Sequence, residues 1–180
     1  MITKLSPKAV KKSNKQFTHE FEIVLVAEHM QYAQNVASLF RIADALKARK
    51  IYLTGESHHP PFGKDLQKVS RGKERVVAWE YSIGVVPVLE KLKKEGYTII
   101  AIEQCEESHL FTEVRYPKKL ALLVGSEMFG MSKKALSLCD RAVIIPMYGN
   151  GGSINVHVAL AVVAFYAVSQ RKALKQSEAN

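Results

Sequence analysis

The chain has 180 residues, with 26 Lys and Arg against 17 Asp and Glu, which gives a formal net charge of +9. A domain of this length buries roughly 70% of the surface that its unfolded chain exposes. With 47% apolar and 24% charged residues, the composition excludes disorder for the bulk of the chain. The longest apolar run, 158–168, is shorter than the roughly 20 residues that a membrane-spanning helix needs, so we expect no membrane segment.

The two cysteines, Cys105 and Cys139, are too few for a disulfide framework and lie beside apolar stretches. This pattern favours reduced thiols and a cytoplasmic location. No set of His, Cys and acidic residues has the spacing of a four-ligand metal site, so we expect no metal. The positive charge raises encounter rates with polyanions and is typical of nucleic-acid-binding proteins, although charge alone does not identify the polyanion.

Residues 1–18 are expected to form a basic N-terminal arm, and the first fifteen hold five lysines and no acid. We expect this arm to be mobile, and a solvated tail explains the pattern as well as a functional contact does. Residues 19–172 are expected to form one domain, because no repeat or linker divides them. Residues 173–180 are expected to be a short C-terminal tail.

Strands and helices alternate along this domain. Apolar runs predict strands at 21–27, 51–53, 76–79, 98–102, 120–124 and 142–145. Helical spacing and helix-start signals predict helices at 31–47, from 64, at 85–95, at 132–138 and at 153–171. Because the strands are continuous apolar runs, we expect a parallel sheet with helices on both faces. Ligands bind beyond the carboxyl ends of such strands, which directs attention to the loops there.

The loop after the strand 120–124 carries Gly125, Glu127 and Gly130. Its glycine spacing is that of a phosphate-binding loop, but Met131 takes the place of the essential Lys and Glu127 would repel phosphates. These two residues therefore disfavour a nucleoside triphosphatase. A plain turn with Ser132 as the N-cap of the next helix explains Gly130 but not Glu127. We expect the Glu127 carboxylate to meet a donor group, on a ligand or on a neighbouring side chain.

The loop after the strand 142–145 ends in Ser153 and Asn155. Ser153 is interpreted first as an ordinary N-cap of the following helix. Asn155 would then lie just inside that helix, where Asn is a poor helix former, so we expect its amide to serve a specific purpose. Gly151 and Gly152 would let the backbone approach a ligand closely.

Asn35 and Arg41 lie on the predicted helix 31–47. Six residues place them two turns apart and within about 120° of each other around the helix axis. Taken alone the pair is weak evidence, because an Arg in an apolar stretch is more often an ion-paired residue at the edge of a helix, here with Asp44.

Taken together, the three segments resemble the three motifs of the SpoU/TrmH family of SPOUT-class RNA ribose methyltransferases. The motifs lie in the family's order at 35–44, 123–132 and 145–156, and the resemblance extends from about Phe21 to Val168. It implies an α/β fold whose C-terminal segment forms a deep trefoil knot, and a homodimer. It further implies S-adenosylmethionine as the cofactor and transfer of its methyl group to a ribose 2′-hydroxyl of RNA, either tRNA or rRNA.

The resemblance also implies roles for ten residues. The catalytic set would be Asn35, Arg41, Glu127, Ser153 and Asn155, and backbone groups around Ile102, Gly125, Ile145, Met147 and Ile154 would bind the cofactor. Because a guanidinium stays protonated, Arg41 would stabilise the developing alkoxide and grip an adjacent phosphate. Asn35 would orient Arg41 or the ribose, and Glu127 would hold the Asn155 amide or the cofactor's amino group. Ser153 and Asn155 would position phosphate and ribose.

The chain departs from the family's usual pattern at Ile154, where Leu is common, and at His157, where a small Ser is common. His157 is interpreted as an ordinary helix residue or as a local proton acceptor. The alternative function is a non-catalytic RNA-binding homodimer on the same knotted fold, which the intact polar set disfavours. Base methylation is disfavoured because the Asn35/Arg41 and Ser153/Asn155 pairs are those of the ribose-modifying branch.

Overall fold

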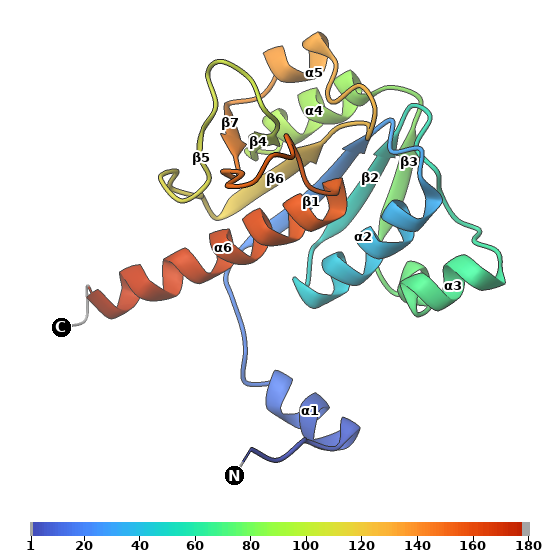
Figure 1. Ribbon diagram of the computed structural model, residues 1–180, viewed down its shortest axis with the longest axis vertical. Coiled ribbons are helices and arrows are strands. Elements are labelled where there is room, and N and C mark those ends of the chain that lie inside the picture. Colours follow the sequence, from blue (N-terminus) through green and yellow to red (C-terminus); the bar gives the residue numbers. More distant parts are fainter. Residues whose placement is uncertain (1, 178–180) are drawn as a thin grey trace.

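The computed structural model describes the backbone of residues 2–177 and the side chains of residues 2–170. A seven-stranded sheet forms the centre of the protein (Figure 1), and every strand pairing in it is parallel. The strands are β1 (Glu22–Glu28), β2 (Lys50–Thr54), β3 (Trp79–Ser82), β4 (Thr98–Ile102), β5 (His109–Leu110), β6 (Lys119–Val124) and β7 (Arg141–Ile144). Their spatial order is β3-β2-β1-β6-β4-β7-β5.

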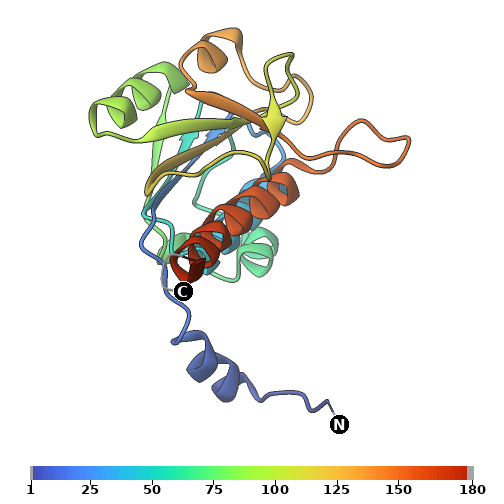
Figure 2. The same cartoon turned by 90° about the vertical axis from the view of Figure 1, so that its left-hand side faces the viewer.

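Helices cover both faces of this sheet. The helices are α1 (Pro7–Asn14), which lies apart from the sheet, and α2 (Ala33–Ala45), α3 (Lys64–Ser70), α4 (Val85–Lys94), α5 (Lys133–Ser137) and α6 (Val156–Ser177), with a 3₁₀ turn at Lys73–Arg75. Helices α2, α3 and α6 pack on one face, and α4 and α5 pack on the other (Figures 1 and 2). The parallel sheet with helices on both faces is confirmed. No helix within residues 2–177 has the length and hydropathy needed to cross a membrane.

The continuous apolar runs follow from burial on both faces of the sheet. Successive strand side chains point to opposite faces. In β1, Ile23 and Leu25 therefore enter the core beneath α2 and α6, whereas Val24 and Val26 enter the core on the side of α4. Parallel pairing brings the carboxyl ends of β1, β6, β4 and β7 to one edge, where Ala27 is level with Val124. The loops predicted to carry chemistry therefore meet at this edge.

Within residues 19–172, three elements differ most from the sequence predictions. The strand expected at 76–79 is β3 at Trp79–Ser82. Residues 73–75 form a 3₁₀ turn instead, after which Val76 is 70% exposed and only Val77 is buried. The short edge strand β5 was not expected. Helix α6 begins at Val156, three residues later than predicted.

The N-terminal arm contains a helix, α1, that the sequence did not indicate. Ser6 caps it by accepting a hydrogen bond from the Ala9 backbone N–H at 3.2 Å, and Pro7 occupies its first turn, both of which favour a helix start. The helix buries no residue and lies away from the body of the protein (Figures 1 and 2). At the other end, α6 continues through most of the expected tail to Ser177, and residues 178–180 lie outside the described part of the chain.

Candidate active site

A cavity of about 610 Å³ lies at the carboxyl ends of β4, β6 and β7. All five predicted cofactor residues line it, as do four of the five predicted catalytic residues. The lining residues include Ile102, Gly125, Ile145, Met147 and Ile154 from the first group, and Asn35, Glu127, Ser153 and Asn155 from the second. The structure thus brings together residues that are separated by more than a hundred positions in the chain.

The loop after β6 is a tight turn built on glycine. Ser126 and Gly130 exchange two backbone hydrogen bonds of 3.0 Å each. A Cβ atom on Gly125 would lie 2.3 Å from the Gly130 carbonyl carbon, so a side chain there would force the turn apart. Gly130 has a φ of +65°, which favours glycine. The loop itself therefore requires both glycines.

Two carboxylates, at the carboxyl ends of the strands on either side of β6, fix this loop at its far end. Glu28, only 2% exposed at the end of β1, accepts hydrogen bonds from the Ser132 backbone N–H at 3.0 Å and from the Ser132 hydroxyl at 2.7 Å. Glu103, which follows β4, accepts from the Met131 backbone N–H at 2.9 Å. Ser132 caps α5 by accepting from the Ala135 backbone N–H at 3.1 Å, as the sequence indicated.

The Glu127 carboxylate connects this loop to the N-terminus of α2. It accepts hydrogen bonds from the Asn35 side-chain amide at 2.6 Å and from the backbone N–H groups of Gln31 at 3.1 Å and Tyr32 at 3.4 Å. A negative charge at a helix N-terminus is favourable, because unpaired backbone N–H groups point toward it. The donors that meet Glu127 are therefore Asn35 and the chain entering α2. Asn155 reaches Glu127 only through Asn35, to whose Oδ1 atom its side-chain amide donates at 3.1 Å.

Asn155, and not Ser153, caps helix α6. Its Oδ1 atom accepts a hydrogen bond from the His157 backbone N–H at 3.1 Å. Its backbone carbonyl accepts from Val158 and Ala159 at 3.0 Å each. The prediction of Ser153 as the N-cap is therefore wrong: the helix starts three residues later, and the asparagine that looked misplaced inside it is a favoured cap. Ser153 is exposed on the wall of the cavity.

Arg41 is the one predicted site residue that does not line the cavity. It is exposed on α2, about 9 Å along the helix axis from Asn35. Asp44, considered as its ion-pair partner, pairs with Lys73 at 2.8 Å instead. Among the described residues, Arg41 has no hydrogen bond or ion pair. A single copy of the chain therefore leaves Arg41 outside the cavity.

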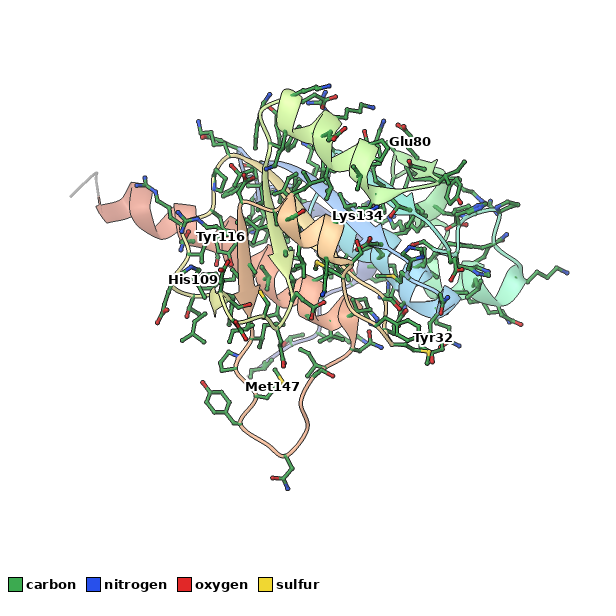
Figure 3. All side chains as sticks on the ribbon, turned by 90° about the horizontal axis from the view of Figure 1, so that it is seen from above. Tyr32, Glu80, His109, Tyr116, Lys134 and Met147 are labelled. Carbon is green, nitrogen blue, oxygen red and sulfur yellow. The ribbon has the colours of Figure 1, made fainter. Side chains whose placement is uncertain are left out.

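The loop after β7 differs in kind from the loop after β6. It projects from the body of the protein, with Met147 near its base (Figure 3). A Cβ atom on Gly149, Gly151 or Gly152 would meet nothing within 4 Å, so the chain itself does not require these glycines. The Gln104 side-chain amide donates a hydrogen bond to the Gly152 carbonyl. The space beside Gly152, on the cavity wall, suits close approach of a ligand to the backbone.

The cavity combines apolar walls with two carboxylates. Ile102, Val124 and Ile145 supply apolar surface, and Glu103 and Glu127 supply negative charge within a chain of net charge +9. Such a site suits a ligand with a flat apolar part and a positive charge. Sequence reasoning missed Glu28, Glu103 and the Gln31–Tyr32 backbone. The available signal was an acidic residue directly after an apolar strand, which occurs at Glu28 and again at Glu103.

Comparisons with known proteins agree with this geometry. The model of the SpoU rRNA Methylase family matches residues 22–165. The tRNA (guanosine(18)-2'-O)-methyltransferase of Thermus thermophilus is 32% identical over 154 residues, which are 83% of this chain and 76% of the relative.

Two solved structures are similar in fold. The TrmH/SpoU tRNA modifying enzyme of A. aeolicus superposes with a TM-score of 0.77 at 26% identity, covering 93% of this chain and 86% of that one. The SpoU methyltransferase AviRb from Streptomyces viridochromogenes, crystallised with the cofactor AdoMet, superposes with a TM-score of 0.74 at 22% identity, covering 86% and 59% of the two chains. The family model spans most of the chain, including every residue that lines the cavity. The chain therefore belongs to the SpoU rRNA Methylase family.

Proposed function

We propose that this protein is an S-adenosylmethionine-dependent methyltransferase that methylates a ribose 2′-hydroxyl of tRNA or rRNA. The observation that carries the proposal is the hydrogen-bonded series of Glu127, Asn35 and Asn155 along the wall of the cavity. The names of the family and of the Thermus relative support the substrate class and the reaction. The same intact series speaks against a purely RNA-binding protein.

The cavity fits the cofactor. Its volume of about 610 Å³ lies within the range of roughly 300–1,000 Å³ typical of small-molecule sites. Backbone groups around Ile102, Gly125, Ile145, Met147 and Ile154 would hold the adenosine and methionine parts. The carboxylates of Glu103 and Glu127 suit a cationic ligand. When bound, S-adenosylmethionine supplies an electrophilic methyl group on a positively charged sulfur.

The residues of the chain must align the ribose hydroxyl with that methyl group and stabilise the oxygen as its proton leaves. Asn35 and Asn155 are held by hydrogen bonds before any RNA arrives, so little ordering remains for them on binding. Ser153, exposed beside them, would contact phosphate or ribose. Arg41 would stabilise the developing alkoxide and grip an adjacent phosphate.

A homodimer is part of the proposal. Helix α6 exposes an apolar stripe formed by Val158, Val162 and Phe165, which are 41%, 38% and 48% exposed. Their i, i+4 and i+7 spacing places them on one helix face. A second copy that packs on this stripe would bury it. In such a dimer, Arg41 of one copy would reach the cavity of the other copy. Mixed dimers of Arg41→Ala and Asn35→Ala chains test this, because one intact site should restore part of the activity that each pure variant lacks.

The C-terminal trefoil knot is also proposed. Helix α6 lies against the segment that precedes β6. Tyr166 donates a hydrogen bond from its hydroxyl to the Thr112 carbonyl at 2.9 Å. Gln170 donates to the Val114 carbonyl at 2.9 Å and accepts from the Tyr116 backbone N–H at 3.2 Å. These contacts support a C-terminal helix that is threaded behind the 103–118 segment.

For the remainder of the chain, we propose a domain of residues 19–172 between an RNA-attracting arm, residues 1–18, and a short tail. All five lysines of the arm are exposed, and three of them lie on α1. A cytosolic location fits the two free cysteines. Replacing the five lysines with Gln should weaken RNA binding and flatten its salt dependence without changing cofactor affinity.

Methyl transfer onto RNA from cells that lack this protein tests the function. Purified enzyme, labelled S-adenosylmethionine and separately purified tRNA and rRNA should give label on one class at a ribose that resists alkaline cleavage on its 3′ side. Asn35→Ala is the matched inactive control. Cofactor and RNA binding without transfer to either RNA class would favour the non-catalytic RNA-binding homodimer.

A further inference from the structure

His157 contacts the site from behind. It lies in the first turn of α6, and its Nδ1 atom is 3.1 Å from the Asn35 Oδ1 atom in α2. The imidazole is partly buried and does not line the cavity, whereas Asn35 does. His157 therefore touches a wall residue of the site without facing the cofactor space.

The direction of each hydrogen bond around Asn35 is determined. Both oxygens of the Glu127 carboxylate accept from backbone N–H groups, and one also meets the Asn35 side chain at 2.6 Å. The Asn35 group facing that carboxylate must be its NH₂, since a carbonyl there would oppose another acceptor. The Asn35 Oδ1 atom then faces two donors, Asn155 Nδ2 and His157 Nδ1, each at 3.1 Å. His157 must therefore carry a proton on Nδ1.

We propose that His157 is a positioning residue for methyl transfer: its Nδ1–H group holds the Asn35 carbonyl so that the Asn35 NH₂ group stays directed at Glu127. The catalytic part of this inference rests on the proposed function. Neutral and protonated imidazole both keep a proton on Nδ1 in this arrangement, so the contact is present in either charge state. Burial lowers the pKa of His157 and favours the neutral form.

Without the His157 side chain, Asn155 alone would hold the Asn35 carbonyl. The histidine adds a second donor from the same helix turn, so helix α6 fixes both the rotamer and the amide orientation of Asn35. Such a contact should change the rate of the chemical step more than the affinity for cofactor.

Two substitutions separate positioning from other roles. His157→Ala removes the donor and should lower the single-turnover rate by about five- to tenfold, the usual effect of losing one hydrogen bond. His157→Asn places an NH₂ group where Nδ1 lies and should stay within about twofold of wild type. Cofactor affinity by calorimetry should change less than about twofold in both. His58→Ala is the matched control, because His58 is exposed and its side chain makes no hydrogen bond within residues 2–170.

A double-mutant cycle tests whether His157 acts through Asn35. In the Asn35→Ala background, His157→Ala should add almost no further loss of rate, because coupled residues are non-additive. Long-range ¹H–¹⁵N NMR spectra give a readout that needs no activity. They should show the Nδ1–H tautomer, and the Asn35 amide signals should shift in His157→Ala and return in His157→Asn.

Three outcomes would overturn the proposal. A wild-type rate for His157→Ala would show that the histidine is a spectator. Equal losses in His157→Ala and His157→Asn, together with loss of the acidic limb of the pH–rate profile, would show that the imidazole is a base. An Nε2–H tautomer would contradict the assigned hydrogen bonds. Absence of methyl transfer by the wild-type protein would instead refute the proposed function and leave the NMR result standing.

Discussion

The loops that follow β6 and β7 both carry glycines beside the same cavity, but the glycines serve different needs. In the loop after β6, Gly125 and Gly130 are required by the packing of the chain against itself. In the loop after β7, a side chain on Gly151 or Gly152 would meet open space. The presence of glycine in a sequence therefore does not tell whether the turn itself requires it or whether it leaves room for a ligand to approach the backbone.

The loops also differ in how they are held. The first is fixed by its own turn and by the carboxylates of Glu28 and Glu103. The second projects from the protein, and the Gln104 side-chain amide donates a hydrogen bond to its Gly152 carbonyl. We infer that the loop after β6 is rigid and folds without ligand, whereas ligands approach the cavity past the loop after β7.

The largest expected effect is on Gly125. Gly125→Ala would place a methyl group 2.3 Å from the Gly130 carbonyl carbon, so the loop must distort. We expect a loss of about 3 kcal/mol in the free energy of unfolding, measured by urea denaturation. Gly151→Ala is the control and should stay within about 0.5 kcal/mol of wild type. Equal stability of the two variants would refute the distinction between the loops.

Glu127→Gln should keep the fold and lower the activity. The glutamine would present an NH₂ group to at least one of the N–H donors of Gln31, Tyr32 and Asn35, all of which need an acceptor. Hydrogen bonds to a charged group contribute about 1.5–3 kcal/mol, so the single-turnover rate should fall about 10- to 100-fold. Glu106→Gln, at an exposed position outside the cavity, should leave the rate unchanged.

A smaller effect is expected in the loop after β7. Gly152 lines the cavity and Gly151 does not, so Gly152→Ala should weaken S-adenosylmethionine binding by about fivefold. Gly151→Ala should leave that affinity unchanged, and neither variant should change the unfolding free energy by more than about 0.5 kcal/mol. Isothermal titration calorimetry measures the affinities. Loss of stability in Gly152→Ala would show that the loop after β7 is also held in place by its own packing.

The smallest effect is a difference in thiol reactivity between the two cysteines. Cys139 follows α5, the helix that comes directly after the loop following β6, and burial raises the pKa of its thiol to about 12. Cys105 is exposed, next to the Gln104 that contacts Gly152. Because the thiolate is the reactive form, iodoacetamide at pH 8 should label Cys105 and leave Cys139 unmodified in the native protein, as measured by peptide mass spectrometry. Comparable labelling of both cysteines would show that the region around Cys139 opens to solvent in the native protein.

The parts of the fold that were predictable are those decided by burial. The central strands are buried on both faces, so their apolar runs indicated both their position and their parallel pairing. Where burial does not decide, the prediction failed. Val76 and Val77 look like a strand, yet only Val77 is buried. Helix α1 contacts no core, and its start depends on the Ser6 cap.

For the site, the family resemblance identified nine residues that line one cavity, but the contacts between them depend on geometry that sequence spacing does not contain. Asn155 caps α6 because the helix begins at Val156. The apolar pattern of the helix did not locate this start to within three residues. Arg41 has the spacing of a site residue but lies outside the cavity of its own copy. In the proposed dimer, the contacts of Arg41 would depend on the surface of the second copy. The spacing of residues along one chain does not indicate such contacts.

Glu127 belongs to the loop after β6, yet its hydrogen bonds end at the start of α2, the helix that carries Asn35 and Arg41. A ligand that displaces this carboxylate must therefore act on the helix as well. Thermodynamic reciprocity then requires that, if cofactor changes the affinity for RNA through this contact, RNA changes the affinity for cofactor by the same factor. One carboxylate would then couple the affinity for cofactor to the affinity for RNA.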